Sequence, residues 1–173
     1  MRHFLIVLLL VVVVSSCKED PDPVLSTAKS PYIGNQLKTT GYYSLSFNNA
    51  EARYLNYFLY RDGTILYGGS PLQTEVINRE SEYANGQWAG ISASEKTFWG
   101  VFTVSGNSIF FDQWYLRDGN VLASYKTYGT ILNDTTFVMT STDREGFEDV
   151  PLDETYRFTA FSAKPDSVNQ FLD

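Results

Sequence analysis

The chain is poor in the side chains that carry most nucleophilic and metal chemistry. It has one histidine, His3, and one cysteine, Cys17, among 173 residues, and both lie near the N-terminus. Catalysis by a Cys/His pair or a Ser/His/Asp triad needs a histidine beside the nucleophile. Zinc sites need several cysteine or histidine ligands, and a disulfide needs two thiols. The remainder of the chain therefore lacks the side chains for all of these sites.

Basic residues are also scarce. The chain has 13 Lys and Arg against 20 Asp and Glu, a net charge of −7. An acidic protein repels phosphate backbones, so we expect no nucleic-acid partner. We predict no metal and no cofactor. The acidic stretch between Asp143 and Glu154 offers oxygen ligands that calcium accepts, but it lacks the spacing and the fixed glycine of an EF-hand. A solvated hairpin loop is the favoured interpretation of this stretch.

One long apolar run is present, and it lies at the start of the chain. Residues 4–14 contain no polar side chain and follow Arg2. A transmembrane helix needs about 20 apolar residues, so this run is too short to span a bilayer. A basic start, a short apolar run and small residues before a cleavage point are typical of a secretory signal. We predict that residues 1–16 are a signal peptide.

Residues 14–17 read Val-Ser-Ser-Cys, which resembles the lipobox of bacterial lipoproteins. The resemblance implies cleavage before Cys17 and acylation of that residue. Two or three acyl chains would anchor the protein firmly, whereas one chain binds a membrane only marginally. The membrane is therefore the first expected partner, reached through an N-terminal lipid.

The next residues, Lys18, Glu19 and Asp20, look like the surface-export signal of Bacteroidetes lipoproteins, a lysine followed by two acids. This likeness implies a lipid-anchored protein of the outer membrane, displayed on the cell surface. The periplasmic face is the alternative location. An ordinary solvated charge run is the plain alternative for so short a motif.

Proline-containing sequence without periodicity continues to about residue 37, with Pro21, Pro23 and Pro31 among polar residues. Such composition is typical of a linker. We therefore predict a flexible tether over residues 17–37 and one folded domain over residues 38–173.

From Thr39 onward the pattern is β, with aromatic and β-branched residues in short runs between turn residues. The turns at Asp62-Gly63, Ser105-Gly106-Asn107, Asp118-Gly119-Asn120 and Asn133-Asp134 suit tight hairpins. We predict an all-β, antiparallel up-and-down meander of about eight to nine strands. The predicted strands cover residues 41–47, 53–60, 64–68, 87–92, 97–104, 108–116, 121–132, 135–141 and 155–161.

Two segments interrupt this pattern. Between Pro71 and Asn85, apolar residues lie at roughly helical spacing among charged ones, which predicts a short helix or lid. At the end of the chain, Asp166 or Ser167 could cap a brief helix that carries Val168, Phe171 and Leu172.

The meander, its single helical interruption and the tail over residues 161–167 resemble the lipocalin-like, calycin-type barrels of small Bacteroidetes lipoproteins of uncharacterised function. The resemblance covers roughly residues 39–173 and implies a closed or nearly closed barrel that binds small, partly apolar or glycan-like molecules at its mouth. The Gly-x-Trp signature of true lipocalins is absent, and Gly41-Tyr42-Tyr43 stands in its place.

Several predicted strands are apolar on both faces, which requires a dry neighbour on each side. One face can line the barrel, and the other can lie under residues 71–85, against the terminal helix or against a partner. Most of the 27 aromatic residues, 12 Phe, 12 Tyr and 3 Trp, are expected to form core. If a cavity exists among them, binding sites combine apolar walls with a few polar groups. The predicted ligand-binding residues are then Tyr43, Asn56, Tyr57, Trp99, Gln113, Trp114 and Tyr128.

Two function classes remain open. The first is a non-catalytic lipoprotein that binds a small molecule in its barrel. The second is a filled barrel whose exposed aromatic patch docks on an envelope protein. An enzyme would have to work through carboxylates, as glycosidases do. Asp112 is the one candidate, and a position facing a water-filled barrel end is its favoured interpretation.

Overall fold

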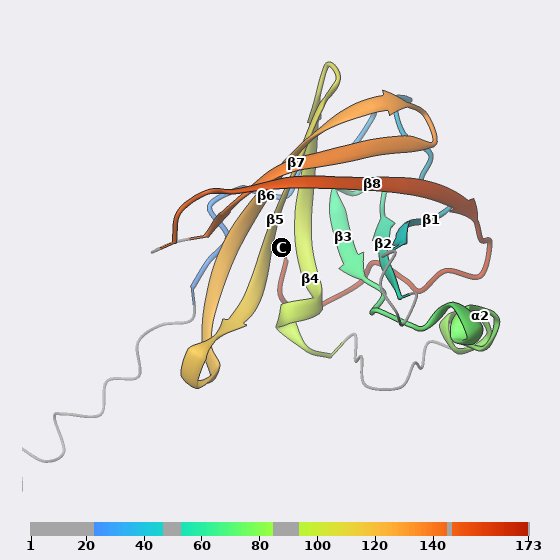
Figure 1. Ribbon diagram of the computed structural model, residues 1–173, viewed down its shortest axis with the longest axis horizontal. Coiled ribbons are helices and arrows are strands. Elements are labelled where there is room, and N and C mark those ends of the chain that lie inside the picture. Colours follow the sequence, from blue (N-terminus) through green and yellow to red (C-terminus); the bar gives the residue numbers. More distant parts are fainter. Residues whose placement is uncertain (1–22, 47–52, 85–93, 145–146, 173) are drawn as a thin grey trace, which may run out of the picture.

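The computed structural model describes residues 23–46, 53–84, 94–144 and 147–172 (Figure 1). Predictions for the signal peptide, Cys17, the export residues Lys18, Glu19 and Asp20, and the strand over residues 87–92 lie outside these ranges. The elements are β1 (Gly41–Ser46), β2 (Tyr54–Leu59), β3 (Thr64–Tyr67), the 3₁₀ turn η1 (Gln73–Glu75), α2 (Val76–Ala84), η2 (Lys96–Phe98), β4 (Trp99–Ser105), β5 (Ser108–Arg117), η3 (Asp118–Asn120), β6 (Val121–Asn133), β7 (Thr136–Arg144) and β8 (Val150–Ala160).

The eight described strands form a closed antiparallel barrel in sequence order. Closure comes from β1, which pairs with β8 so that Tyr43 lies opposite Phe158. β1 also pairs with β2, where Tyr43 lies opposite Tyr57. The predicted all-β meander is confirmed, and the pairing of its first and last strands is a long-range contact that local patterns do not determine.

The predicted turns form where residues tolerate a positive φ. Gly63 has a φ of 88°, Gly106 of 59° and Gly119 of 77°, and Asn120 follows with 61°. Tight hairpins need such angles because only they match the twist of the adjoining strands. These turns fix the register of the β2–β3, β4–β5 and β5–β6 hairpins.

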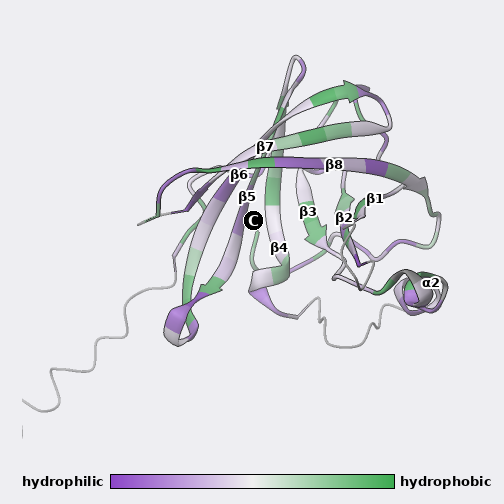
Figure 2. Ribbon diagram, viewed as in Figure 1, coloured by the Kyte–Doolittle hydropathy of each residue, from purple (hydrophilic) through white to green (hydrophobic). Residues whose placement is uncertain are grey.

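Strands β1 to β6 each contribute to two apolar layers because successive side chains point to opposite faces, whereas β7 and β8 contribute to the inner layer alone. The inner layer fills much of the barrel and is built around Tyr43, Phe111 and Phe137. The outer layer lies against the barrel wall and is built around Phe58 and Trp99. Figure 2 shows hydrophobic stretches along the strands and hydrophilic residues at the β5–β6 tip.

The outer layer has its own cover. Tyr83 of α2 is 1% exposed and packs edge-on against Phe58 at 4.9 Å. Phe161, Phe171 and Leu172 of the chain end pack against the same layer. Of the three covers expected for the second apolar face of the strands, residues 71–84 and the chain end both lie on it in the structure.

The predicted C-terminal helix is wrong for the described residues 161–172, which are irregular. The Asp166 carboxylate accepts the backbone N–H of Val168, and the Asn169 side-chain oxygen accepts those of Phe171 and Leu172. Side chains that bond nearby backbone groups offer an alternative to helical hydrogen bonds. The segment therefore folds as successive side-chain-closed turns.

Strand β8 begins five residues earlier than predicted, at Val150 rather than Thr155. Part of the predicted acidic hairpin loop is thus strand, with Val150 opposite Thr142 and Pro151 opposite Ser141. The long partner strand β7 supports this extension, because its ladder continues to the same level. Glu154 and Leu152 consequently alternate with exposed Asp153 rather than lying in a loop.

Residues 23–37, which we call the strap, pack on the barrel instead of forming a free tether. Leu25, Tyr32 and Leu37 are buried. The Asp112 carboxylate accepts hydrogen bonds of 3.0 Å from the Ser26 hydroxyl and from the Thr27 backbone N–H. The tether prediction is wrong here because polar and proline-rich composition conceals three widely spaced apolar anchors. The folded body therefore begins before residue 38.

Candidate functional site

The two ends of the barrel differ. We call the end formed by the β2–β3, β4–β5 and β6–β7 turns the closed end, because the last part of the strap crosses it. We call the other end, formed by the β5–β6 hairpin tip and the β7–β8 connection, the open end. In Figure 1 these two connections lie on the same side of the barrel as the start of the described chain.

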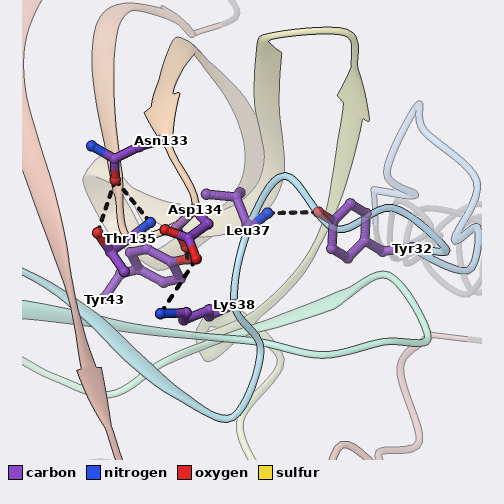
Figure 3. A network of polar contacts seen from close by, with 7 residues as sticks. All are labelled: Tyr32, Leu37, Lys38, Tyr43, Asn133, Asp134 and Thr135. Carbon is purple, nitrogen blue, oxygen red and sulfur yellow. Dashed lines mark hydrogen bonds and ion pairs between the residues drawn. The ribbon is translucent and has the colours of Figure 1, made fainter.

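The closed end is sealed by a polar and aromatic network (Figure 3). The backbone N–H of Leu37 donates to the Tyr32 hydroxyl at 2.7 Å. Lys38 pairs with the Asp134 carboxylate at 3.3 Å, and the Tyr43 hydroxyl donates to the Asp134 carbonyl at 3.1 Å. The first contact closes the strap on itself, and the other two join Lys38, which directly follows the strap, and β1 to the β6–β7 turn.

The open end contains a cavity of about 450 Å³ that extends into the barrel. Strands β2, β3, β5, β6, β7 and β8 all contribute to its wall, together with η2. Ligand sites are concave and mostly apolar, with a few placed polar groups. Eight of its lining residues are aromatic: Tyr57, Tyr67, Phe98, Phe111, Trp114, Tyr115, Tyr125 and Tyr156.

Tyrosine hydroxyls supply the deeper polar groups of the cavity. The Tyr125 hydroxyl donates to the Gln113 side-chain oxygen at 3.2 Å, and the Tyr156 hydroxyl donates to Glu154 at 3.0 Å. Burial raises the pKa of Tyr57, Tyr125 and Tyr156 above the ordinary value for tyrosine. These hydroxyls therefore stay protonated and neutral at physiological pH.

Arg144 brings a positive charge to the wall of the cavity. Its guanidinium lies over the Tyr115 ring at 5.5 Å and over the Tyr125 ring at 5.4 Å. The Tyr115 hydroxyl is buried and has no hydrogen-bond partner among the described residues. A buried hydroxyl without a partner carries a desolvation cost of about 1–3 kcal/mol. A ligand group that bonds this hydroxyl would recover that energy.

The structure brings three of the predicted binding residues together in this cavity. Tyr57, Gln113 and Trp114 all line it. Tyr57 and Gln113 lie on the inner face of β2 and β5, and Trp114 lies where η2 adjoins the wall. These three residues therefore lie together at the open end of the barrel.

The other four predicted residues lie elsewhere. Tyr43 is fully buried at the closed end, packed 5.0 Å from Phe137. Trp99 belongs to the outer layer. Asn56 points to the same outer side, where its side-chain nitrogen donates to the Tyr83 hydroxyl at 3.3 Å. Tyr128 is 39% exposed on the outside of β6.

Several lining residues were missing from the prediction, among them Tyr115, Tyr125 and Arg144. Strand alternation could have found two of them. Residues two apart point to one face, so Gln113 implies Tyr115, and the Gln113 to Tyr125 pairing implies Tyr125. No sequence pattern predicts that Arg144 lines the cavity, because its position in the wall depends on how far β7 extends.

Asp112 does not face a water-filled barrel end, so the favoured interpretation of it is wrong. Its side chain is fully buried on the outer face of β5, and it holds the strap through Ser26 and Thr27. Its second carboxylate oxygen has no hydrogen-bond partner among the described residues. Asp112 is thus an anchor for the strap.

Two further hollows lie on the outer surface. One, of about 460 Å³, lies between α2 and β1 beside Tyr42 and Glu80. The other, of about 660 Å³, lies beside Tyr60 and Lys164 near the chain end. Each has two aromatic rings in its wall against eight in the barrel cavity. The barrel cavity is therefore the stronger candidate for an apolar ligand.

The described part of the chain contains no group of three or more Asp, Glu, His or Cys residues placed to hold a metal ion. Within the same ranges, no helix combines the length and the apolar character needed to span a bilayer. No protein-family model, curated protein or solved structure matches this chain.

Proposed function

We propose that this protein is a cell-envelope lipoprotein that binds a small, partly apolar molecule in the open-end cavity without transforming it. The observation that carries the proposal is a 450 Å³ space lined by eight aromatic rings in a barrel whose other end is sealed. Ligand cavities generally measure about 300–1,000 Å³. A filled barrel would have no such space.

The wall of the cavity indicates the chemistry of the ligand. Aromatic rings favour an apolar or ring-shaped body, including the apolar face of a sugar. Neutral tyrosine hydroxyls and Gln113 can bond hydroxyl or carbonyl groups, and Arg144 suits an acceptor of partial or full negative charge. The ligand we infer is amphipathic, with its apolar part inside the barrel and its polar part toward Arg144.

Binding rather than catalysis is favoured by the acid content of the cavity. Glu154 is the one carboxylate among the described lining residues, and it accepts a hydrogen bond from Tyr156. Carboxylate-based glycoside hydrolysis uses a pair of acids across the bond. Asp112, the other candidate, is held under the strap.

The cellular location of the protein is proposed from its N-terminal residues. Cleavage before Cys17 and acylation of that residue would hold the protein in the outer membrane, and Lys18, Glu19 and Asp20 would direct it to the cell surface. The periplasmic face of the same membrane is the alternative. A shift in mass of the purified chain by two or three acyl groups, lost in Cys17→Ser, tests this part.

The ligand proposal is tested by titration with the fluorescent apolar amine N-phenyl-1-naphthylamine. The protein sample comprises residues 18–173, which include every described residue. We expect saturable binding that Leu152→Trp blocks, because Leu152 lines the cavity. The matched control is Tyr128→Trp on the outer face. Binding that survives Leu152→Trp, or that Tyr128→Trp abolishes, would contradict the proposal.

One observation favours the second candidate, a protein-interaction module. Phe110 and Tyr128 stack 6.0 Å apart on the outer side of β5 and β6, and Tyr128 is exposed. Exposed aromatic patches often mark protein contacts. If the amine does not bind and Tyr128→Ala releases an envelope protein that co-purifies with the wild type, this second function replaces the first.

A further inference from the structure

Four large apolar side chains are exposed around the open end. Leu116 and Val121 flank the η3 turn and are 55% and 47% exposed. Phe147 and Val150 lie at the β7–β8 connection and are 57% and 48% exposed. We call these four residues the mouth rim. Isolated exposed apolar residues are ordinary, but a group around the opening of a cavity indicates a contact surface.

The strap begins at this same end. The Pro23 carbonyl accepts hydrogen bonds from the Trp114 indole at 2.9 Å and from Lys96 at 3.4 Å. The Lys96 ammonium also lies over the Trp114 ring at 4.7 Å. Since Trp114 lines the cavity, Pro23 is fixed beside the mouth.

From Pro23 the strap runs along the outside of the barrel to the closed end. Ser30 lies against the β2–β3 turn, where a Cβ on Gly63 would come within 2.1 Å of the Ser30 carbonyl oxygen. Tyr32 then donates its backbone N–H to the Arg61 carbonyl at 2.9 Å. The strap therefore starts at the open end and reaches the closed end only at its last residues. The part of the chain before Pro23 thus joins the barrel at the open end.

The position of Cys17 in the sequence indicates which end of the barrel a lipid anchor would hold near the membrane. Cys17 precedes Pro23 by six residues, and a fully extended chain spans at most about 3.3–3.6 Å per residue, roughly 20 Å in total. An acyl group on Cys17 would therefore hold the open end within about 20 Å of the membrane surface. The closed end would face away from it.

We propose that the mouth rim is a docking surface for a lipid bilayer, so that the cavity opens toward the membrane and receives an amphiphilic ligand from it. This inference rests on the lipid anchor and the binding cavity of the proposed function. Asp118, Glu148 and Asp149 adjoin the rim and outnumber Arg117 beside them, so anionic lipids would be repelled. The surface that fits is zwitterionic, such as phosphatidylcholine.

The test uses the full chain, purified from cell membranes and placed in phosphatidylcholine nanodiscs. A thiol-reactive bimane label is attached at Val121→Cys on the rim or at Asn107→Cys in the β4–β5 turn of the closed end. An acylated Cys17 has no free thiol to compete for the label. The nanodisc lipid carries a nitroxide near its headgroup, which quenches nearby bimane.

We expect the label at residue 121 to lose most of its fluorescence and the label at residue 107 to keep most of it. Equal quenching at the two sites, or stronger quenching at residue 107, would overturn the proposal. The contribution of the rim itself is tested with Phe147→Glu/Val150→Glu, which should restore fluorescence at residue 121. The matched control, Leu132→Glu/Val168→Glu, changes two exposed apolar residues away from the rim and should not.

Failure of this proposal is distinguishable from failure of the proposed function. If Cys17 reacts with bimane and the chain does not remain with the nanodisc, the lipid anchor is rejected, and the proposed orientation is rejected with it. Saturable binding of the naphthylamine in the same sample would leave the cavity proposal intact. Quenching that does not differ between the two ends, in a chain that remains anchored, removes only the orientation.

Discussion

The two ends of this barrel are built from the same strands and similar residues, yet one is solid and the other hollow. At the closed end, Phe137 is fully buried and lies 5.0 Å from both Tyr43 and Tyr156. At the open end, Phe98 and Tyr67 stack at 5.9 Å beside the cavity and remain partly exposed. Aromatic content therefore does not decide which end is filled.

The strap makes the difference. Tyr32 and Leu37 belong to the inner layer of the barrel, where Tyr32 packs 5.4 Å from Phe102. No described segment plays the same part at the open end. A single additional crossing of the chain, with two buried side chains, converts one barrel end from a cavity into core.

The largest expected effect comes from removing an aromatic ring of the closed end. Phe137→Ala should lower the free energy of unfolding by about 3–5 kcal/mol, because the packed surroundings cannot close the resulting cavity. Phe98→Ala at the open end should cost much less, because its ring is already partly exposed. Urea unfolding followed by tryptophan fluorescence measures both. Equal losses would show that the two ends do not differ in packing.

A smaller loss is expected when the strap is released. Asp112→Ala should lower the free energy of unfolding by about 1–3 kcal/mol, because it leaves the partly buried Thr27 N–H without its acceptor. Ser26→Ala removes one bond together with its donor and should cost about 1 kcal/mol or less. Limited proteolysis near residues 23–30 should accelerate in Asp112→Ala first. Unchanged cleavage would mean that the carboxylate does not hold the strap.

A loss of binding without a loss of stability is expected at the open end. Tyr115→Phe removes a buried hydroxyl that has no described partner, so the free energy of unfolding should rise, by up to about 1–3 kcal/mol. Binding of N-phenyl-1-naphthylamine should weaken by about two- to tenfold if its N–H bonds this hydroxyl. Calorimetric titration measures the change. If Tyr115→Phe lowered the free energy of unfolding and left binding unchanged, Tyr115 would be a structural residue and not a ligand contact.

The smallest expected effect is a pH dependence at the closed end. Burial lowers the pKa of Lys164 from 10.5 to about 8, against the nearby Asp62 carboxylate, which raises it. Between pH 8 and 10.5 the unfolded chain then binds more protons at this site, so stability rises with pH. The rise is small, because Lys164 is only half-buried and solvent screens its charge.

Ionisation of tyrosines ends this rise in stability at high pH. Burial raises the pKa of Tyr83 from 10.0 to about 12, so above pH 10 the unfolded chain loses protons first and stability falls. Thermal unfolding should therefore give a shallow maximum near pH 10. Lys164→Met should abolish the rise and keep the fall. A rise that persists in Lys164→Met would assign it to another group.

The strands and turns could be predicted because they depend on local chemistry. Positive φ at Gly63, Gly106 and Gly119 is a property of the residues themselves. The division of the barrel into a closed and an open end could not be predicted, because it depends on where the strap crosses the barrel. Tyr43 and Tyr57 have similar sequence surroundings and lie opposite one another on β1 and β2, yet only Tyr57 lines the cavity.

The route of the strap also determines how the molecule bears a mechanical load. A pull on an N-terminal anchor acts first on the Pro23 carbonyl, then on the two bonds at Asp112, and only afterwards on Tyr32. The strap would detach one contact at a time, as a peeled strip does, before any barrel strand carries tension. The closed end is thereby reached only after the earlier contacts of the strap have been lost.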